Sequence, residues 1–109
     1  MKLTTTIASL FLAVLAPVVA SEGLLGFVAI ADSENEQNVL PASENCFAYP
    51  GGPTTTRFIN VVPLEDTPAI RCTFFTSATC DGDQITLNTG EHQFRRDLVV
   101  GSWECEPQA

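Results

Sequence analysis

Few side chains in this 109-residue chain can carry chemistry: four cysteines and a single histidine stand out. The cysteines are Cys46, Cys72, Cys80 and Cys105. Reduced thiolates would hold zinc or attack a substrate, whereas disulfides would cross-link a small fold. No Cys-x2-Cys pair occurs, and an even number of cysteines downstream of an apolar leader is typical of two disulfides in a secreted domain. Four cysteines allow three pairings, and loop entropy favours none of them clearly.

The second candidate chemistry is acid–base catalysis by His92, because histidine is the usual proton-transfer group near neutral pH. Serine-type catalysis would require His92 to activate Ser77 or Ser102, with Asp97 orienting the ring. None of these residues stands in a nucleophile-elbow motif or a comparable local pattern. We therefore expect His92 to be a surface residue, and we expect no catalytic residues and no enzyme activity.

The amino-terminal residues 1–20 resemble an export signal. Lys2 precedes an apolar run over 7–16, and Val18-Val19-Ala20 fits a peptidase site. The run is too short for a membrane span, which needs roughly 20 apolar residues. We expect cleavage after Ala20, a secreted, extracellular protein, no membrane span, and one β domain over 21–109.

This domain is strongly acidic, since 21–109 hold four arginines against 13 carboxylates. A net side-chain charge of −9 repels phosphate backbones and anionic membranes. We therefore expect no nucleic-acid partner. The residue inventory also indicates no cofactor and no metal ion.

Short apolar or alternating runs between turn residues predict an all-β fold. The first expected strand is 24–31, and the polar stretch 32–38 is interpreted as a solvated loop or a partly disordered link. The region 21–45 therefore holds one strand and a flexible segment. Further strands are expected as follows: 57–62, the hairpin 69–76 with 84–87 around Asp81-Gly82-Asp83, and 98–100 and 102–106 after a polar segment.

Four residues of the second half of the chain resemble a known motif. Phe75, Cys80 and Gly82 are similar to the aromatic-x4-aromatic-x-Gly signature of βγ-crystallin Greek keys, with cysteine at the second aromatic position. Ser102 follows where that family places the serine that caps its folded hairpin. Small secreted cysteine-rich fungal proteins, including candidate effectors and killer-toxin-like proteins, also look similar over 72–105. The resemblance covers 69–106, and 21–66 shows no matching signature.

The resemblance implies a small disulfide-stapled Greek-key β-sandwich in which Phe75, Gly82 and Ser102 have structural roles. It places Cys72 and Cys105 on adjoining strands facing the core, which implies the bonds Cys72–Cys105 and Cys46–Cys80. Some βγ-crystallins bind calcium through a run that would correspond to 97–102 here. That run keeps only its first acid and last serine, too few oxygens for a hard cation.

Trp103, Tyr49 and Phe94 are the candidate binding residues. A core position beside the disulfides is the simplest role for Trp103, but exposed aromatics would stack on sugars or anchor a protein contact. The resemblance implies an effector-like or toxin-like binding protein whose partner is an extracellular protein, and this is the function we expect. The alternative is a carbohydrate or cell-wall binding module for a polysaccharide, and a small hydrolase is the least favoured.

Overall fold

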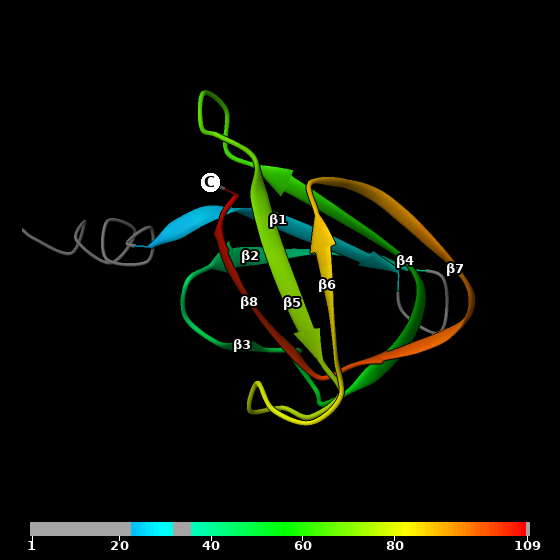
Figure 1. The fold of residues 1–109 in the computed structure, drawn as a ribbon. Helices are drawn as coiled ribbons and strands as arrows, with labels where there is room; N and C mark the ends of the chain where they lie inside the picture. The colour runs from blue at the N-terminus through cyan, green and yellow to red at the C-terminus, as the bar shows by residue number, and fades with distance from the viewer. Residues whose placement is uncertain (1–22, 32–35, 109) are drawn as a thin grey trace, which may run out of the picture.

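The structure is a computed structural model that describes residues 23–31 and 36–108. The expected signal 1–20 lies outside the described residues. Those that are described form eight strands (Figure 1). The strands are β1 (Leu24–Ala31), β2 (Gln37–Ser43), β3 (Phe47–Ala48), β4 (Thr54–Pro63), β5 (Ile70–Phe75), β6 (Gln84–Asn88), β7 (Gly90–Val100) and β8 (Ser102–Pro107). Within these two ranges there is no helix of the length and apolarity that crossing a membrane requires.

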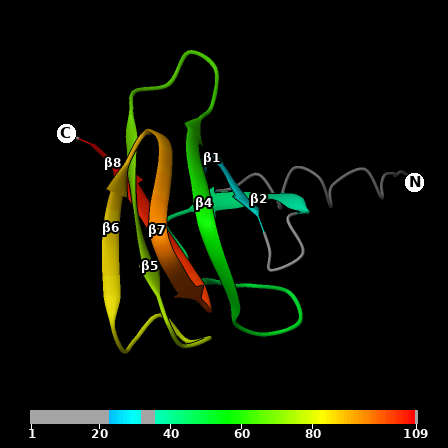
Figure 2. The same cartoon turned by 90° about the vertical axis from the view of Figure 1, so that its right-hand side faces the viewer.

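The strands form two antiparallel four-stranded sheets, with orders β2-β1-β4-β7 and β3-β8-β5-β6. Figure 2 shows β5, β6 and β8 on one side of the molecule and β1, β2 and β4 on the other. Alternate residues of each strand face the space between the sheets, because successive side chains of a strand point to opposite faces. The largest fully buried side chains are Trp103, Phe74, Ile30, Ile59 and Ile70. The predicted all-β, disulfide-stapled sandwich is confirmed.

The first half of the chain (β1 to β4) and the second half (β5 to β8) have the same strand order, and each half contributes one strand to the sheet of the other. In the second half, β8, β5 and β6 are neighbours in one sheet while β7 lies in the other. In the first half, β4, β1 and β2 are neighbours and β3 joins the sheet of the second half. Each half is thus a four-strand Greek-key unit, and 21–66 has this arrangement without carrying the sequence signature.

Two strands differ from the expectation for the first half. Residues 37–43 form β2, which pairs with all of β1, where only a flexible segment was expected. Apolar residues on both faces of β2 and Pro41 at its centre conceal the alternation that identifies a strand. Proline is tolerated because β2 is an edge strand with one free side. The two-residue β3 is too short to leave a pattern.

The polar segment before Leu98 was also not expected to be a strand, yet β7 runs through it from Gly90 to Val100. His92 and Phe94 are half-buried while Glu91 and Gln93 are exposed, so the strand does alternate. Before Leu98, its inward positions hold a histidine and one phenylalanine rather than aliphatic residues. The hydrophobic period is therefore weak in the sequence.

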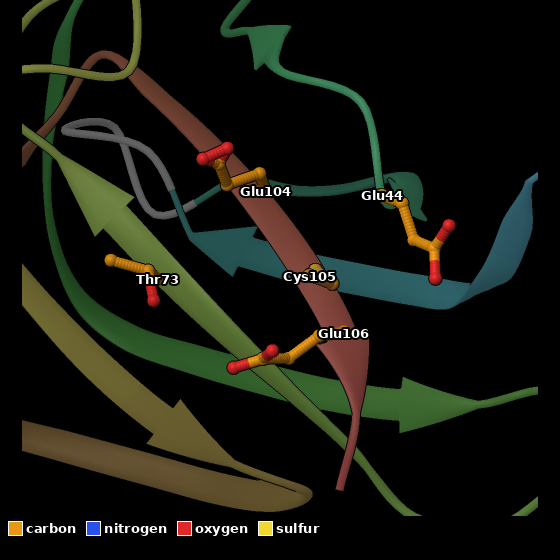
Figure 3. A pocket seen from close by; sticks show the side chains of 5 residues that line it. All are labelled: Glu44, Thr73, Glu104, Cys105 and Glu106. Carbon is orange, nitrogen blue, oxygen red and sulfur yellow. The ribbon is translucent and has the colours of Figure 1, made fainter.

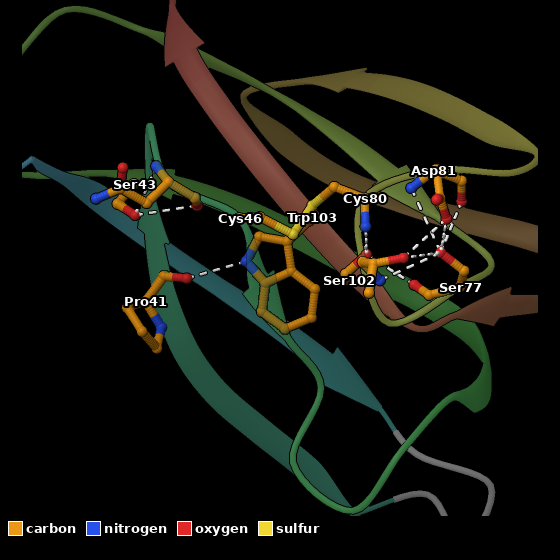
Figure 4. Close-up of a disulfide and its surroundings, with 10 residues drawn as sticks. Pro41, Ser43, Cys46, Ser77, Cys80, Asp81, Ser102 and Trp103 are labelled. Carbon is orange, nitrogen blue, oxygen red and sulfur yellow. Dashed lines mark hydrogen bonds between the residues drawn. A yellow bond between two sulfur atoms is a disulfide. The ribbon is translucent and has the colours of Figure 1, made fainter.

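Two disulfides fasten the sandwich, and they are the pairs that the resemblance implies. Cys72 and Cys105 are register partners on β5 and β8, with Cα atoms 4.0 Å apart, and both are buried. Cys46, between β2 and β3, bonds Cys80 in the β5–β6 connection (Figure 4). The first bond links two strands of one sheet, whereas the second links the two halves of the chain.

Candidate functional site

The β5–β6 connection folds back over the start of β8, and Ser102 holds it there. The Ser102 hydroxyl is fully buried, accepts the Cys80 backbone N–H at 2.8 Å and donates to the Ser77 carbonyl at 2.7 Å (Figure 4). Gly82 takes a φ of 90°, a conformation that favours glycine. The Phe75 side chain is buried. These contacts stabilise the connection, so the predicted motif residues are part of the scaffold.

The same connection carries a small hydrogen-bond network around Asp81. The Ser77 hydroxyl contacts the Asp81 carboxylate, and the Thr79 hydroxyl donates to it at 2.9 Å. Hydrogen bonds from Ser77 and then Thr79 lower the pKa of Asp81 below its ordinary value, because they stabilise the charged form. The Ser77 hydroxyl is thus already engaged within its own turn.

The residues considered for serine-type catalysis do not meet. His92 places Nε2 2.7 Å from the backbone carbonyl oxygen of Asn88, and Asp97 binds the Arg57 guanidinium at 2.8 Å. Ser102 is enclosed in the folded connection. A triad requires nucleophile, base and orienting acid within hydrogen-bond reach of one another, and here each group has a different partner.

Trp103 lies in the core, which is the simplest role predicted for it, so the exposure that a binding role would require is absent. It is fully buried, and its indole N–H donates to the Pro41 carbonyl at 2.9 Å (Figure 4). Its ring centroid lies 5.3 Å from Phe47, 5.9 Å from Phe74 and 6.3 Å from Tyr49. An apolar body with one satisfied polar atom is typical of a core tryptophan. Trp103 therefore joins the two sheets.

Tyr49 lies half-buried at the rim of this aromatic cluster. Its hydroxyl oxygen accepts a hydrogen bond from the Asn38 side-chain amide at 2.8 Å. Leu40 and Pro50 complete a hollow of about 270 Å³ around the pair. The hollow offers one aromatic ring, one amide and one apolar wall, a composition that suits a single sugar-sized group.

A second hollow, of about 390 Å³, lies on the outer face of the β5–β8 sheet (Figure 3). It is lined by Glu44, Thr73, Glu104 and Glu106 beside Cys105, and Glu106 binds the Arg71 guanidinium at 2.8 Å. In 23–31 and 36–108, no three histidine, cysteine or carboxylate side chains are arranged to hold a metal ion. We interpret this hollow as part of the acidic surface.

The third hollow is a shallow groove along β7, which we call the β7 groove. Its volume is about 520 Å³, and it is lined by Gln93, Phe94, Arg95, Arg96, Asp97 and Leu98, of which Asp97 is paired with Arg57. Phe94 and Leu98 are half-buried, so they form an apolar floor, whereas both arginines are exposed. Phe94, like Tyr49, is thus a predicted binding residue that lines an open hollow. The neighbouring arginine pair was visible in the sequence, but its position beside this floor depends on the unexpected course of β7.

No family model matches this chain, and no curated protein or solved structure matches it significantly.

Proposed function

We propose that the protein is a secreted, non-enzymatic binding protein of the effector-like or toxin-like class, with a βγ-crystallin-like Greek-key scaffold. Two disulfides support an oxidising, extracellular setting. The strand order of both halves and the Ser102 contacts support the crystallin-like scaffold. The separate engagement of His92, Ser77 and Ser102 supports binding rather than catalysis.

The observation that carries the proposal is the state of the four arginines. Arg57 and Arg71 each bind a carboxylate at 2.8 Å. Within the described residues, Arg95 and Arg96 have no carboxylate partner, although the sequence has 13 carboxylates in all. The exposed cations of an acidic protein are attracted to the protein's own carboxylates. Two neighbouring arginines that have no such carboxylate partner, and that lie beside an apolar floor, are therefore suited to an external partner.

The side chains of the β7 groove indicate which groups the partner would present. Guanidinium groups form bidentate hydrogen bonds with carboxylates, and arginine is enriched at binding hot spots. Phe94 and Leu98 would accept an apolar side chain between the charged contacts. We infer that the target is an extracellular protein that presents acidic side chains next to an apolar one.

The experiment starts from the oxidised protein recovered from the medium of an expression host. The protein is cross-linked in extracellular fluid, the captured protein is purified, and its affinity is then measured against single variants. We expect Arg95→Gln and Arg96→Gln each to weaken binding by about tenfold, since each removes a charge-assisted contact. Binding should also weaken as salt rises, because salt screens contacts between opposite charges.

Arg71→Gln is the control, because it removes one guanidinium from a different surface, where Arg71 is half-buried and paired with Glu106. It should leave the affinity within about twofold. An equal loss in Arg71→Gln and Arg95→Gln would show that only net charge matters and would refute the β7 groove as the contact.

The hollow at Tyr49 supports carbohydrate binding as a second candidate. Chitin or glucan fragments that enter it should change the fluorescence of Trp103, whose ring lies 6.3 Å from Tyr49. Tyr49→Ala should abolish that change, whereas Arg95→Gln should not affect it. An unchanged spectrum with every polysaccharide tested would eliminate this candidate.

A further inference from the structure

The two disulfides differ in how easily an external thiol can reach them. Cys72 and Cys105 are 0% and 5% exposed, and they lie opposite one another on two central strands. Cys46 is exposed, in the connection between β2 and β3, and Cys80 is half-buried in the β5–β6 connection. Thiol–disulfide exchange requires a thiolate to reach a sulfur atom, so burial slows it. Cys46 is therefore the cysteine that a thiol attacks first.

The backbone conformation of Cys80 also favours opening of its disulfide. Its φ is 55°, in the left-handed region, which costs free energy for a residue with a side chain. Cys80 is restrained there by the bond to Cys46 and by the Ser102 hydroxyl, which accepts the Cys80 N–H at 2.8 Å. When the disulfide opens, one of these two restraints is lost and the backbone can relax. Strained and exposed disulfides are the more easily reduced ones.

The same disulfide fastens β3 to the second half of the chain. β3 has two residues, which pair with the start of β8. One more backbone hydrogen bond follows, from the Tyr49 N–H to the Gly101 carbonyl at 2.9 Å. A strand with so few hydrogen bonds opens at a low cost in free energy. The disulfide of Cys46, which directly precedes β3, is therefore a main restraint on this strand.

β3 and the residue after it cover Trp103, the only tryptophan of the chain. The Trp103 ring centroid lies 5.3 Å from that of Phe47 on β3 and 6.3 Å from that of Tyr49. With β3 in place, Trp103 is 0% exposed. If β3 moves away from β8, these two rings leave the indole, and the indole becomes accessible to solvent.

We propose that Cys46 is a site of thiol exchange, and that reduction of its bond to Cys80 releases β3 and uncovers Trp103. The buried Cys72–Cys105 bond stays oxidised and continues to hold β5 to β8. An oxidising fluid leaves both bonds closed, whereas a reducing compartment opens only the first. The protein would then expose an aromatic cluster that is covered in its oxidised form.

The exchange has two steps, and two small thiols are its reductant. The thiolate of the first attacks Sγ of Cys46 and forms a mixed disulfide there, and Cys80 leaves as a thiolate. The second thiolate attacks the small-molecule sulfur of the mixed disulfide and releases Cys46 as a thiolate. The two small thiols end as one disulfide, and the two protein sulfurs take up two electrons and two protons.

The test is stepwise reduction of the oxidised protein with dithiothreitol, in which each sample is alkylated and mapped by mass spectrometry. We expect alkylated Cys46 and Cys80 to appear at least about a hundredfold faster than alkylated Cys72 and Cys105, because reaching the second pair requires a much larger opening of the fold. In the same samples, the Stern–Volmer constant for acrylamide quenching of Trp103 fluorescence should rise at least about threefold once the first bond is open. Reoxidation should restore the weak quenching.

C46A/C80A should show the stronger quenching without any reductant, because it lacks the restraint on β3, and its circular dichroism spectrum verifies that it retains the sheets. If this variant does not fold, the partly reduced wild-type protein answers the same question. Reduction of both bonds at the same rate would overturn the proposal. So would weak quenching of Trp103 in protein whose Cys46 and Cys80 are alkylated. Target binding through the β7 groove is measured on the oxidised protein, so the two proposals can fail separately.

Discussion

Ser102→Ala tests whether one buried hydroxyl holds the folded β5–β6 connection. The hydroxyl makes two hydrogen bonds, of 2.8 Å from the Cys80 N–H and 2.7 Å to the Ser77 carbonyl. A hydrogen bond contributes about 1 kcal/mol net, and each partner left unpaired in a partly buried place adds to the loss. We therefore expect the free energy of unfolding to fall by about 2–3 kcal/mol. For a domain of this size that lowers Tm by roughly 10–20 °C.

The assay is thermal and urea unfolding of the oxidised protein, with amide exchange of Cys80 as a local measure. Ser43→Ala is the control, because its hydroxyl bonds only the backbone of Asn45 in an exposed turn. It should cost less than about 0.5 kcal/mol. If Ser102→Ala costs no more than Ser43→Ala and leaves the Cys80 amide equally protected, the assigned role of Ser102 is wrong.

Two further predictions concern the disulfides and the acid limit of stability. The two bonds close loops of nearly equal length, 33 and 34 residues apart, so loop entropy predicts equal losses of about 4 kcal/mol for either double-alanine variant. Cys72 and Cys105 are buried while Cys46 is exposed, so removing the Cys72–Cys105 bond also leaves a cavity in the core. C72A/C105A should therefore unfold at a lower urea concentration than C46A/C80A. Equal urea midpoints for the two variants would contradict this. Because the pKa of Asp81 is lowered in the folded protein, its carboxylate stabilises the fold at pH values above the ordinary aspartate pKa. This stabilisation is lost as the pH falls through the lowered pKa of the folded state. Asp81→Asn should therefore reduce the loss of urea stability between about pH 5 and pH 2, and an unchanged pH dependence would refute the assignment.

The parts of the fold that were predictable are those whose residues carry a local signal. β1 has the expected bounds because its apolar run ends at a cluster of polar residues. The β5–β6 hairpin follows from its β-branched and aromatic residues and from the turn at Asp81-Gly82-Asp83, whereas the pairing of Cys72 with Cys105 follows from the resemblance. The resemblance supplied the pairing, since loop lengths alone left three arrangements open.

The remaining parts depend on contacts between distant segments. β2 is a strand because it can pair with β1, and its own alternation is hidden by Pro41. Trp103 is buried because Phe47 and Tyr49, more than fifty residues earlier, lie against it. The candidate site follows the same rule, since only the course of β7 places Phe94 and Leu98 beside Arg95 and Arg96.

The Cys46–Cys80 disulfide, which links the two halves of the chain, determines what a proteolytic cut would do to the molecule. The connection between β4 and β5 is exposed over 65–69 and is the natural place for a nick. A cut there would leave two fragments that remain covalently joined through Cys46–Cys80, with β3 and β7 each hydrogen-bonded into the sheet of the other fragment. The nicked molecule would keep its shape until a reductant opened that bond. A single cleavage there would therefore leave one covalently linked molecule as long as the Cys46–Cys80 bond stays oxidised.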